Sequence, residues 1–377
     1  MIYFDNSATT RPCQAVADRI NENLTGDLFG NPGSLHTLGL AADTEYKRVT
    51  GSVASMLGAK PDEIFFTSCG SESANTAIRG YMSRNRRSGN RIISTRTEHK
   101  ATLEVLKMLE SEGYEVVYVH CGRDGKPDME EIKANIDGCS LMCFTHVNNE
   151  TGAILPLEEI TAVRNSMNRN CRIYLDCVQS LGKLDINLAR MGVDMASFSG
   201  HKIHGIKGVG VLYVKNGVRI DPLILGGGQQ KGMRSGTESL LLASSFEAAL
   251  SEAVANREKA FGEVQEINSY LRSELTKRGN TILSPDDALP FVLNCSFNRF
   301  ESETMLHCLE IYDIFVSTVS ACSSKAKKVS YVLLECGVDR KTAANAVRLS
   351  FSRYNTMDEA KTFIDTVDEI YDKYLVQ

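Results

Sequence analysis

Apolar residues between positions 60 and 215 occur in short runs that are separated by stretches of helical periodicity. Runs of this length, rich in β-branched and aromatic residues, are typical of buried strands. Strands that alternate with helices need crossover connections, which produce a mostly parallel sheet covered by helices on both faces. The predicted strands are 63–67, 91–95, 115–119, 141–145, 172–176, 195–199 and 209–214. The pattern therefore predicts a large α/β domain.

The pattern changes after Ser239, where a long helical periodicity begins and runs to Gly279. Glycine commonly ends a helix in this way. A strand-like segment and further helical stretches follow, which predict a smaller α+β domain; they are 291–297, then 301–310, 340–346 and 357–374. We assign 13–255 to the large domain, and 1–12 with 256–377 to the small one. The active site is expected at the strand C-termini and in the cleft between the domains.

The 377 residues are 42% hydrophobic and 24% charged, which suits a globular protein with a substantial core. A net charge of −5 gives no general electrostatic reason to bind nucleic acid or an anionic membrane. The basic cluster at 84–91 is explained as the solvated end of a helix. The N-terminus carries an acid, Asp5, and no apolar run, so it fits neither a secretory signal nor a transit peptide. We expect a cytoplasmic protein without nucleic-acid or membrane partners.

The 11 cysteines are odd in number and scattered, without a CxxC pair, which argues against a disulfide framework and a structural zinc site. Most are expected to be small buried hydrophobic residues, and no metal site is predicted. Cys322 differs, because serines flank it and Lys325, Lys327 and Lys328 follow it. Small polar neighbours suggest an exposed, mobile loop, and nearby cations favour the thiolate. Cys322 is the candidate reactive cysteine, with an incidental loop cysteine as the alternative.

A phosphate-binding turn is predicted at 65–75, where a strand ends at small residues and a helix begins. Gly70 and Ser71 stand at this turn. Free backbone N–H groups and the positive end of a helix dipole bind phosphate at such a place. The alternative is a serine N-cap without a ligand. No GxxxxGK[ST] loop occurs and no GxGxxG motif opens the sheet, so the pattern does not favour a nucleotide.

The ends of two neighbouring strands carry the most informative residues. Asp176 ends one strand and Gln179 follows it, while Ser199, His201 and Lys202 emerge from the end of the next. A buried acid is costly unless it meets a cation or a hydrogen-bond donor. Pyridoxal phosphate needs this set: a lysine for a covalent link, an acid that keeps the ring nitrogen protonated, and a helix N-terminus for the phosphate. A structural acid and a surface lysine are the alternatives.

Three further residues are candidates by their position. His99 and Asn149 each follow a predicted strand, so His99 could stack on a cofactor ring and Asn149 could bond a phenolic oxygen or a carboxylate. Arg348 lies in an apolar, strand-like segment, where a guanidinium could clamp a substrate carboxylate with two hydrogen bonds. A packed histidine and a structural ion pair are the alternatives. The convergence of these residues on consecutive strand ends carries the prediction.

With these residues assembled, the chain resembles the cysteine desulfurases of the class V aminotransferase group, in the branch with the longer cysteine-bearing loop. The resemblance covers essentially the whole length. The matching motifs, in family order, are YFDNSATT, GNPGSLH, FTSCGSES, TEHKA, HVNNETG, YLDCVQS, SFSGHKIHG, GGGQQKGMRSGT, SACSS and VRLSFSRYNT.

The resemblance implies a homodimeric pyridoxal-phosphate enzyme of transferase fold type I. It would take sulfur from L-cysteine, release L-alanine and keep the sulfur as a persulfide on Cys322 for an acceptor in iron–sulfur cluster assembly or tRNA thiolation. Lys202 would carry the cofactor and move the substrate proton. Asp176 would contact the ring nitrogen, and His99 would stack on the ring and assist proton transfer. Gln179 would bond the phenolic oxygen, Asn149 would touch the cofactor or the substrate, and Arg348 would bind the substrate carboxylate. The phosphate would be held by Gly70, Ser71, Ser199 and His201, and Thr237 would reach the neighbouring subunit's site.

Alternatives remain at this point. A related class V aminotransferase or lyase would need Lys202 and Asp176 but not Cys322, and a selenocysteine lyase is among these alternatives. A non-catalytic interaction protein could keep the fold without the cofactor. The chain also departs from the family pattern, with Cys69 and Val319 where glycine is usual. Valine restricts the backbone, so Val319 is expected to stiffen the cysteine-bearing loop.

Overall fold

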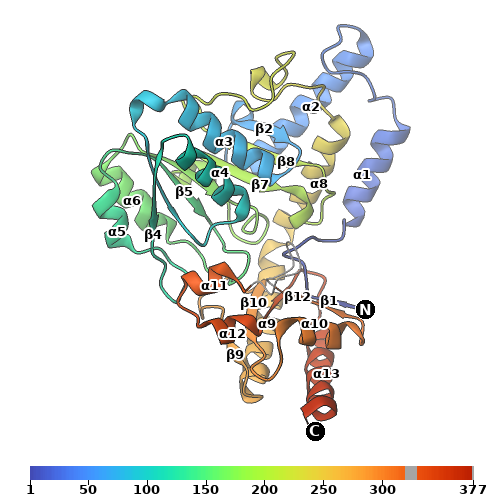
Figure 1. Cartoon of the computed structure of the whole chain (residues 1–377). Helices are drawn as coiled ribbons and strands as arrows, with labels where there is room; N and C mark the ends of the chain where they lie inside the picture. The colour runs from blue at the N-terminus through green and yellow to red at the C-terminus, as the bar shows by residue number, and fades with distance from the viewer. Residues whose placement is uncertain (319–328, 376–377) are drawn as a thin grey trace.

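A seven-stranded, mostly parallel sheet forms the centre of the larger part of the molecule (Figure 1), in a computed structural model that describes residues 1–318 and 329–375. Only β8 runs antiparallel to its neighbours in this sheet. The strand order is β2 (Ile64–Thr67), β8 (Gly210–Val214), β7 (Met195–Ser199), β6 (Arg172–Asp176), β5 (Cys139–Thr145), β3 (Arg91–Thr95) and β4 (Glu115–Val119). The sheet confirms the predicted α/β class.

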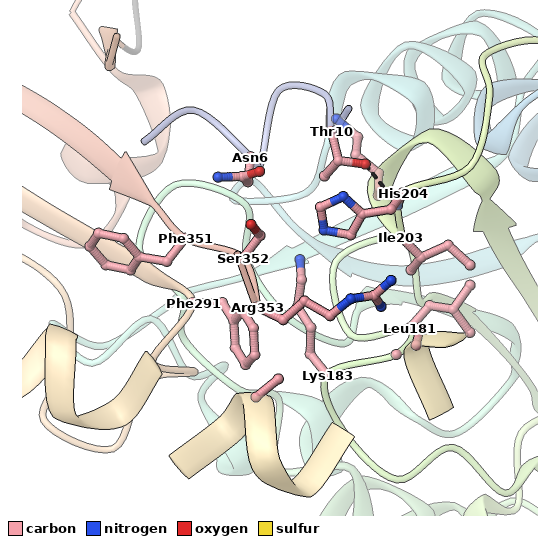
Figure 2. Close-up of a pocket in the computed structure, with 14 residues that line it drawn as sticks. Asn6, Thr10, Leu181, Lys183, Ile203, His204, Phe291, Phe351, Ser352 and Arg353 are labelled. Atoms are coloured by element: carbon pink, nitrogen blue, oxygen red, sulfur yellow. Dashed lines mark hydrogen bonds between the residues drawn. The ribbon is translucent and has the colours of Figure 1, made fainter. Parts of the chain in front are cut away.

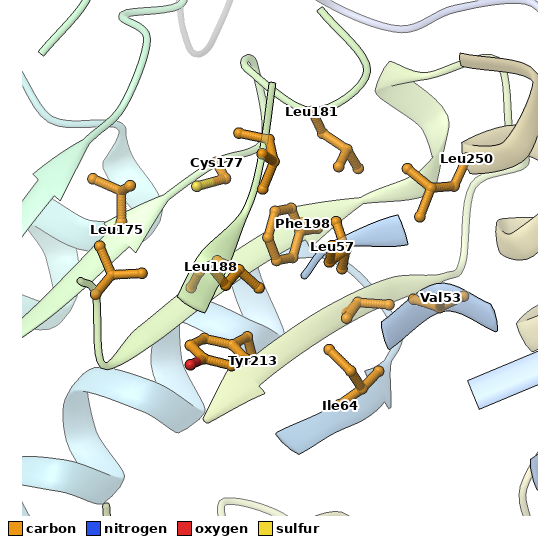
Figure 3. Packing of buried hydrophobic residues seen from close by; sticks show 14 of the residues in the cluster. Val53, Leu57, Ile64, Leu175, Cys177, Leu181, Leu188, Phe198, Tyr213 and Leu250 are labelled. Atoms are coloured by element: carbon orange, nitrogen blue, oxygen red, sulfur yellow. The ribbon is translucent and has the colours of Figure 1, made fainter. Parts of the chain in front are cut away.

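Helices cover both faces of this sheet, because alternate residues of each strand point to opposite sides. In β6, Tyr174 enters the core shared with α3 (Gly70–Arg84) and α4 (Lys100–Ser111). Ile173 and Leu175 enter the opposite core, whose helices are α2 (Thr37–Met56), α6 (Leu157–Met167) and α8 (Leu240–Ala255). Figure 3 shows part of this second core, to which Phe198, Leu57 and Tyr213 belong. The remaining helices of this part are α1 (Gln14–Thr25), α5 (Met129–Asn135) and α7 (Leu188–Met191).

A second, smaller sheet lies below the first in Figure 1. Its order is β12 (Ser317–Thr318), β13 (Ala346–Ser350), β10 (Val292–Ser296) and β9 (Thr281–Ile282), and β1 (Ile2–Tyr3) pairs separately with β11 (Ile314–Phe315). The helices here are α9 (Arg257–Lys277), α10 (Ser302–Glu310), α11 (Tyr331–Glu335), α12 (Arg340–Ala344) and α13 (Met357–Leu375). None of the helices among the described residues is long and apolar enough to cross a membrane.

Two element boundaries differ from the sequence prediction. The long helix predicted before Gly279 is two helices, α8 and α9, separated at Asn256. The break has a packing reason, because α8 buries its apolar face in the core of the large sheet and α9 in that of the small sheet. The helix predicted at 340–346 ends at Ala344, since Ala346 already pairs with Ser296 in the small sheet.

The N-terminal residues belong to the core of the small sheet. Ile2 and Phe4 pack in the same cluster as residues of α9 and α13. This distribution supports the division at residue 255 and the assignment of 1–12 to the small domain, which we keep as a proposal. Beyond Phe4 the chain crosses to the large sheet, where the Thr10 N–H donates to the carbonyl oxygen of His201 at 2.9 Å.

A buried ion pair joins the N-terminal ends of the central strands β6 and β7 to α6. The Asp194 carboxylate is 1% exposed and accepts from Arg164 at 3.0 Å and from Arg172 at 3.2 Å. It also accepts from the backbone N–H of Ile173 at 3.0 Å. Removing one partner of a buried pair is costly, because the other charge stays buried without compensation.

We predict that Asp194→Ala lowers the free energy of unfolding by about 3–5 kcal/mol. The matched control is Asp185→Ala, since Asp185 is an exposed carboxylate that also faces two arginines, Arg190 and Arg257; we expect less than about 1 kcal/mol there. Urea denaturation followed by far-UV circular dichroism measures both. Equal losses in the two variants would contradict the importance of the buried pair.

Candidate active site

A cavity of about 790 Å³ opens at the C-terminal ends of the central strands. Its walls combine residues of the large sheet, the N-terminal segment and the small sheet. The predicted site residues that line it are Gly70, Ser71, His99, Asn149, Asp176, Gln179, Ser199, His201, Lys202 and Arg348. Thr237 is not among the lining residues and is exposed in this single chain. Cys322 and Val319 lie outside the described residues.

The parallel pairing of β5, β6 and β7 explains why these side chains meet. Thr145, at the end of β5, is in register with Asp176, which in turn pairs with Ser197 two residues before the end of β7. Strands in parallel register end at one edge of the sheet, and the polar residues that follow them share that edge. The short turn Gly200–Lys202 then places the Lys202 amine in the cavity.

The N-terminal segment holds the Lys202 amine. The Nζ atom donates hydrogen bonds to the carbonyl oxygens of Ser7 and Ala8, each at 2.6 Å. Ser7 is itself fixed, because its N–H donates to the Ser350 Oγ in the small sheet at 2.8 Å. A lysine amine that lines a cavity and is positioned by backbone carbonyls is suited to attack a carbonyl group.

Asp176 is the buried acid of the site. Burial raises the pKa of its carboxyl group, while the positive charges available at His99 and Lys202 and a hydrogen bond from the Val178 N–H at 2.9 Å act in the opposite direction. A carboxylate in this position has room on its cavity side for a cationic partner, which would relieve the cost of burial. It can therefore hold a protonated ring nitrogen.

Both histidines of the site are neutral near pH 7. Burial lowers the pKa of His99, with Asp176 opposing and Lys202 reinforcing the shift. Its Nδ1 accepts from the Ala101 N–H at 3.1 Å, so the ring proton is on Nε2. Burial and the nearby Lys202 also lower the pKa of His201 to about 4, and its Nδ1 lies 3.1 Å from the Thr9 hydroxyl. Neutral rings can stack or donate one hydrogen bond without adding charge.

The turn at the start of α3 suits an anion. The first turn of a helix has N–H groups without partners inside the helix, and Gly70 and Ser71 present this end of α3 to the cavity. A Cβ atom at Gly70 would lie 2.9 Å from the Val178 Cγ2, so a larger residue would crowd this wall. Ser199 and His201 line the same cavity. Together they supply donors for a phosphate group.

Arg348 enters the cavity from the small sheet. Its guanidinium donates to Asp5 at 2.9 Å and to the Asn149 carbonyl oxygen at 3.1 Å. The buried Nε atom of Arg348 has no hydrogen-bond partner among residues 1–318 and 329–375. Arg348 also lines the cavity, where an entering carboxylate could accept from its guanidinium.

Three acidic residues of the site were missed as candidates in the sequence. Asp5, Glu98 and Glu150 lie inside the motifs YFDNSATT, TEHKA and HVNNETG, and Glu98 and Glu150 directly adjoin the candidates His99 and Asn149. The Glu98 carboxyl accepts from two threonine hydroxyls at 2.8 and 2.6 Å, and burial raises its pKa to about 8. In the sequence, each of these acids stands within an otherwise small or polar motif, and this could have marked it as a candidate. A buried acid requires a partner, but the sequence does not identify that partner.

Glu150 joins the cavity wall to the chain that follows residue 328. The Ser330 hydroxyl, which caps α11, donates to the Glu150 carboxyl group. Burial raises the pKa of Glu150 to about 7, although the Ser330 hydrogen bond and Arg348 act in the opposite direction. Tyr331 makes a second connection, since its hydroxyl donates to the Glu98 carbonyl oxygen at 2.8 Å. These contacts fix the chain on the C-terminal side of the segment that carries Cys322.

The donors of the cavity suit an aromatic, anionic cofactor better than a metal. An amine, a buried carboxylate, neutral imidazoles and a helix N-terminus surround one space. No group of three or more His, Cys, Asp or Glu side chains among the described residues could hold a metal ion. The set fits pyridoxal phosphate, which needs each of these groups.

Comparisons with known proteins agree with this arrangement. The sequence profile of the aminotransferase class-V family matches residues 2–363. A "NifS/IcsS protein homolog" of Lactobacillus delbrueckii is 39% identical over 99% of this chain and 98% of its own length. A "Cysteine desulfurase" of Nostoc sp. is 36% identical over 99% of this chain and 93% of its own length.

Two solved structures are similar to this chain over nearly its whole length. The structure of a "NIFS-LIKE PROTEIN" superposes with a TM-score of 0.93 at 36% identity, and covers 98% of this chain and 99% of its own. A structure described as "SspA in complex with cysteine" has a TM-score of 0.80 at 30% identity, and covers 94% of this chain and 100% of its own.

We predict that Glu150→Gln changes the pH dependence of stability. The folded protein keeps the Glu150 proton until about pH 7, whereas the unfolded chain releases it near 4.5. The wild-type free energy of unfolding therefore falls relative to that of the variant as the pH rises through this window. The difference between variant and wild type should grow by up to about 3 kcal/mol from pH 4.5 to 8.

Urea denaturation of both proteins across this range measures the effect. Glu258→Gln, at an exposed position in the first turn of α9, is the matched control for replacing a carboxyl group by an amide. A constant offset for Glu150→Gln would show that the carboxyl group titrates alike in the folded and unfolded states.

Proposed function

The chain belongs to the aminotransferase class-V family, and from that premise we propose that it is a cysteine desulfurase. It takes sulfur from L-cysteine, releases L-alanine and holds the sulfur as a persulfide on Cys322. The observation that carries this proposal is the single cavity that brings the Lys202 amine, the Asp176 carboxyl and the Arg348 guanidinium together. The full-length likeness to proteins named as cysteine desulfurases supports the same reaction.

Pyridoxal phosphate is the cofactor that we propose. When bound, it withdraws electrons from the substrate and so makes the substrate's bonds near the amine labile. Lys202 would hold it covalently, Asp176 would face its ring nitrogen and His99 would lie against its ring. The remaining contacts would come from Gln179 at the phenolic oxygen and Asn149 at the cofactor or the substrate. Gly70, Ser71, Ser199 and His201 would hold the phosphate, together with Thr237 of the partner subunit in a homodimer.

The chain's own residues have separate tasks in the reaction. Arg348 binds the substrate carboxylate through its guanidinium, which lines the cavity. Lys202 removes the proton next to that carboxylate and returns a proton to the product, because it is the amine at the reacting end of the cavity. Neutral His99, with its proton on Nε2, can donate and take back a proton there.

Sulfur transfer balances with Cys322 as the nucleophile. The Cys322 thiolate attacks the sulfur of the substrate, a sulfur–sulfur bond forms and the carbon–sulfur bond breaks. The electron pair of that bond stays with the substrate carbon, which takes up a proton and leaves as alanine. The persulfide then passes to an acceptor protein, for which we propose iron–sulfur cluster assembly or tRNA thiolation.

We predict that reduction with borohydride labels Lys202. The holoprotein is treated, digested and analysed by mass spectrometry, and the cofactor mass should appear on the peptide that contains residue 202. Lys202→Ala should carry no such label, whereas Lys215→Met, at an exposed lysine outside the cavity, should be labelled like the wild type. A label on another lysine of the wild type would overturn the assignment.

We also predict that the persulfide forms on Cys322 when the enzyme meets L-cysteine. Mapping by mass spectrometry should find one extra sulfur on that residue. Cys322→Ser should lose more than about 99% of alanine production and keep the cofactor's visible absorption, because only the nucleophile is removed. Cys121→Ser, at a cysteine outside the cavity, is the control. Full turnover by Cys322→Ser would favour an aminotransferase or lyase instead.

A further inference from the structure

A second lysine, Lys183, is buried next to the candidate active site. Lys183 is 9% exposed and points into a small cavity of about 30 Å³, which Lys202 also lines (Figure 2). Such a space can hold about one water molecule. Asn6 and Phe291 form other parts of its wall, and the Phe291 ring centroid lies 5.8 Å from the Lys183 Nζ. This cavity is separate from the large one that holds the predicted site residues.

The position of Lys183 is unusual for a buried ammonium group. Its Nζ makes one hydrogen bond, to the Gln179 Oε1 at 3.2 Å, and no ion pair with an acid in the described part of the chain. Burial, reinforced by the charges of Lys202 and Arg348, lowers its pKa to about 7. A buried lysine surrounded by cations costs stability, so a local role at Gln179 would explain its presence.

Gln179 lies between two groups that can each bond only one end of its amide. The ammonium form of lysine is a donor only, and the Lys183 Nζ faces the amide oxygen of Gln179. The Ser7 carbonyl oxygen is an acceptor only and receives the Gln179 Nε2–H at 3.0 Å. The amide nitrogen is therefore held on the side of Ser7. Its second N–H remains for a group in the large cavity, which Gln179 lines.

The same carbonyl connects the two lysines. Ser7 O accepts from Gln179 and also from the Lys202 Nζ at 2.6 Å. Lys183, Gln179, Ser7 and Lys202 thus form one continuous hydrogen-bond network that runs from the small cavity to the large one. A change at Lys183 can reach the reacting amine through this network without any contact to a ligand.

We propose that Lys183 is a positioning residue, which holds the Gln179 amide so that its N–H, and not its oxygen, faces the cofactor beside Lys202. The inference rests on the proposed function. A donor at the phenolic oxygen disfavours the protonated form of the link between Lys202 and the cofactor, because it takes up the negative charge that would stabilise that proton. Loss of Lys183 frees the amide to turn its oxygen toward the cofactor, which favours the protonated link.

The test is a spectrophotometric pH titration of the visible cofactor band in the holoenzyme without substrate. Lys183→Met replaces the ammonium with an unbranched apolar group of similar length and should raise the midpoint by about one pH unit. Lys183→Leu is measured in parallel as a second apolar variant and should shift the midpoint in the same direction. Lys215→Met is the surface control and should titrate like the wild type. Circular dichroism verifies that each variant is folded.

A double-mutant cycle with Gln179→Leu separates positioning from charge. If Lys183 acts by orienting the amide, Lys183→Met has little left to change once Gln179 is absent. In the Gln179→Leu background it should then shift the titration midpoint by at most about a quarter of its shift in the wild-type background. A full shift in the Gln179→Leu background would mean that Lys183 acts through its charge alone, and would overturn the proposal. A wild-type midpoint in Lys183→Met would also overturn it, with the proposed function intact. A wild type without a visible band would instead overturn the proposed function and this inference with it.

Discussion

The hydrogen bonds from the Lys202 amine to the Ser7 and Ala8 carbonyls are the contact on which the arrangement of the site depends. A long, flexible lysine side chain has many rotamers, and ordering it costs conformational entropy. Two fixed acceptors reduce the number of positions that the amine visits. These acceptors are themselves rigid, because the small sheet holds Ser7 through Ser350 and the large sheet holds Thr10 through the His201 carbonyl. Segment 5–10 is thus hydrogen-bonded to both parts of the molecule, and its carbonyl groups position the Lys202 Nζ.

Burial determines which protonation states the titratable side chains at the cavity favour. It favours the neutral forms of Asp176, Glu98 and Glu150 by raising their pKa values, and it keeps His99 and His201 neutral by lowering theirs. A site of this kind has a low dielectric response, in which a bound charge interacts strongly with the few groups that face it. An anionic ligand with a cationic ring would find complementary partners in Lys202, the start of α3 and Asp176. The cost of desolvating these groups would then be offset by binding.

The meeting of two sheets also determines what the cavity can recognise. Arg348 reaches the cavity from β13, and its partners are Asp5 of the N-terminal segment and the Asn149 carbonyl of the large sheet. Glu150 holds Ser330 from the other side. These contacts tie the Arg348 guanidinium and the Ser330 hydroxyl to the same short stretch, 149–150.

The sequence by itself determined the strands, the parallel class of the sheet and the site residues that follow strand ends, because strand periodicity is local and parallel strands must end at one edge. It did not determine the break at Asn256, which depends on two cores that the chain enters in turn. It also did not reveal Asp5 beside Arg348, Ser330 beside Glu150, or Lys183 behind Gln179. In the first two of these pairs the partners are 343 and 180 residues apart, so the pairs depend on packing rather than on periodicity. The third contact is local, four residues apart, but the burial of Lys183 is decided by the fold. Only the tertiary structure could decide them, since a buried charge acquires its role from whichever groups the fold places against it.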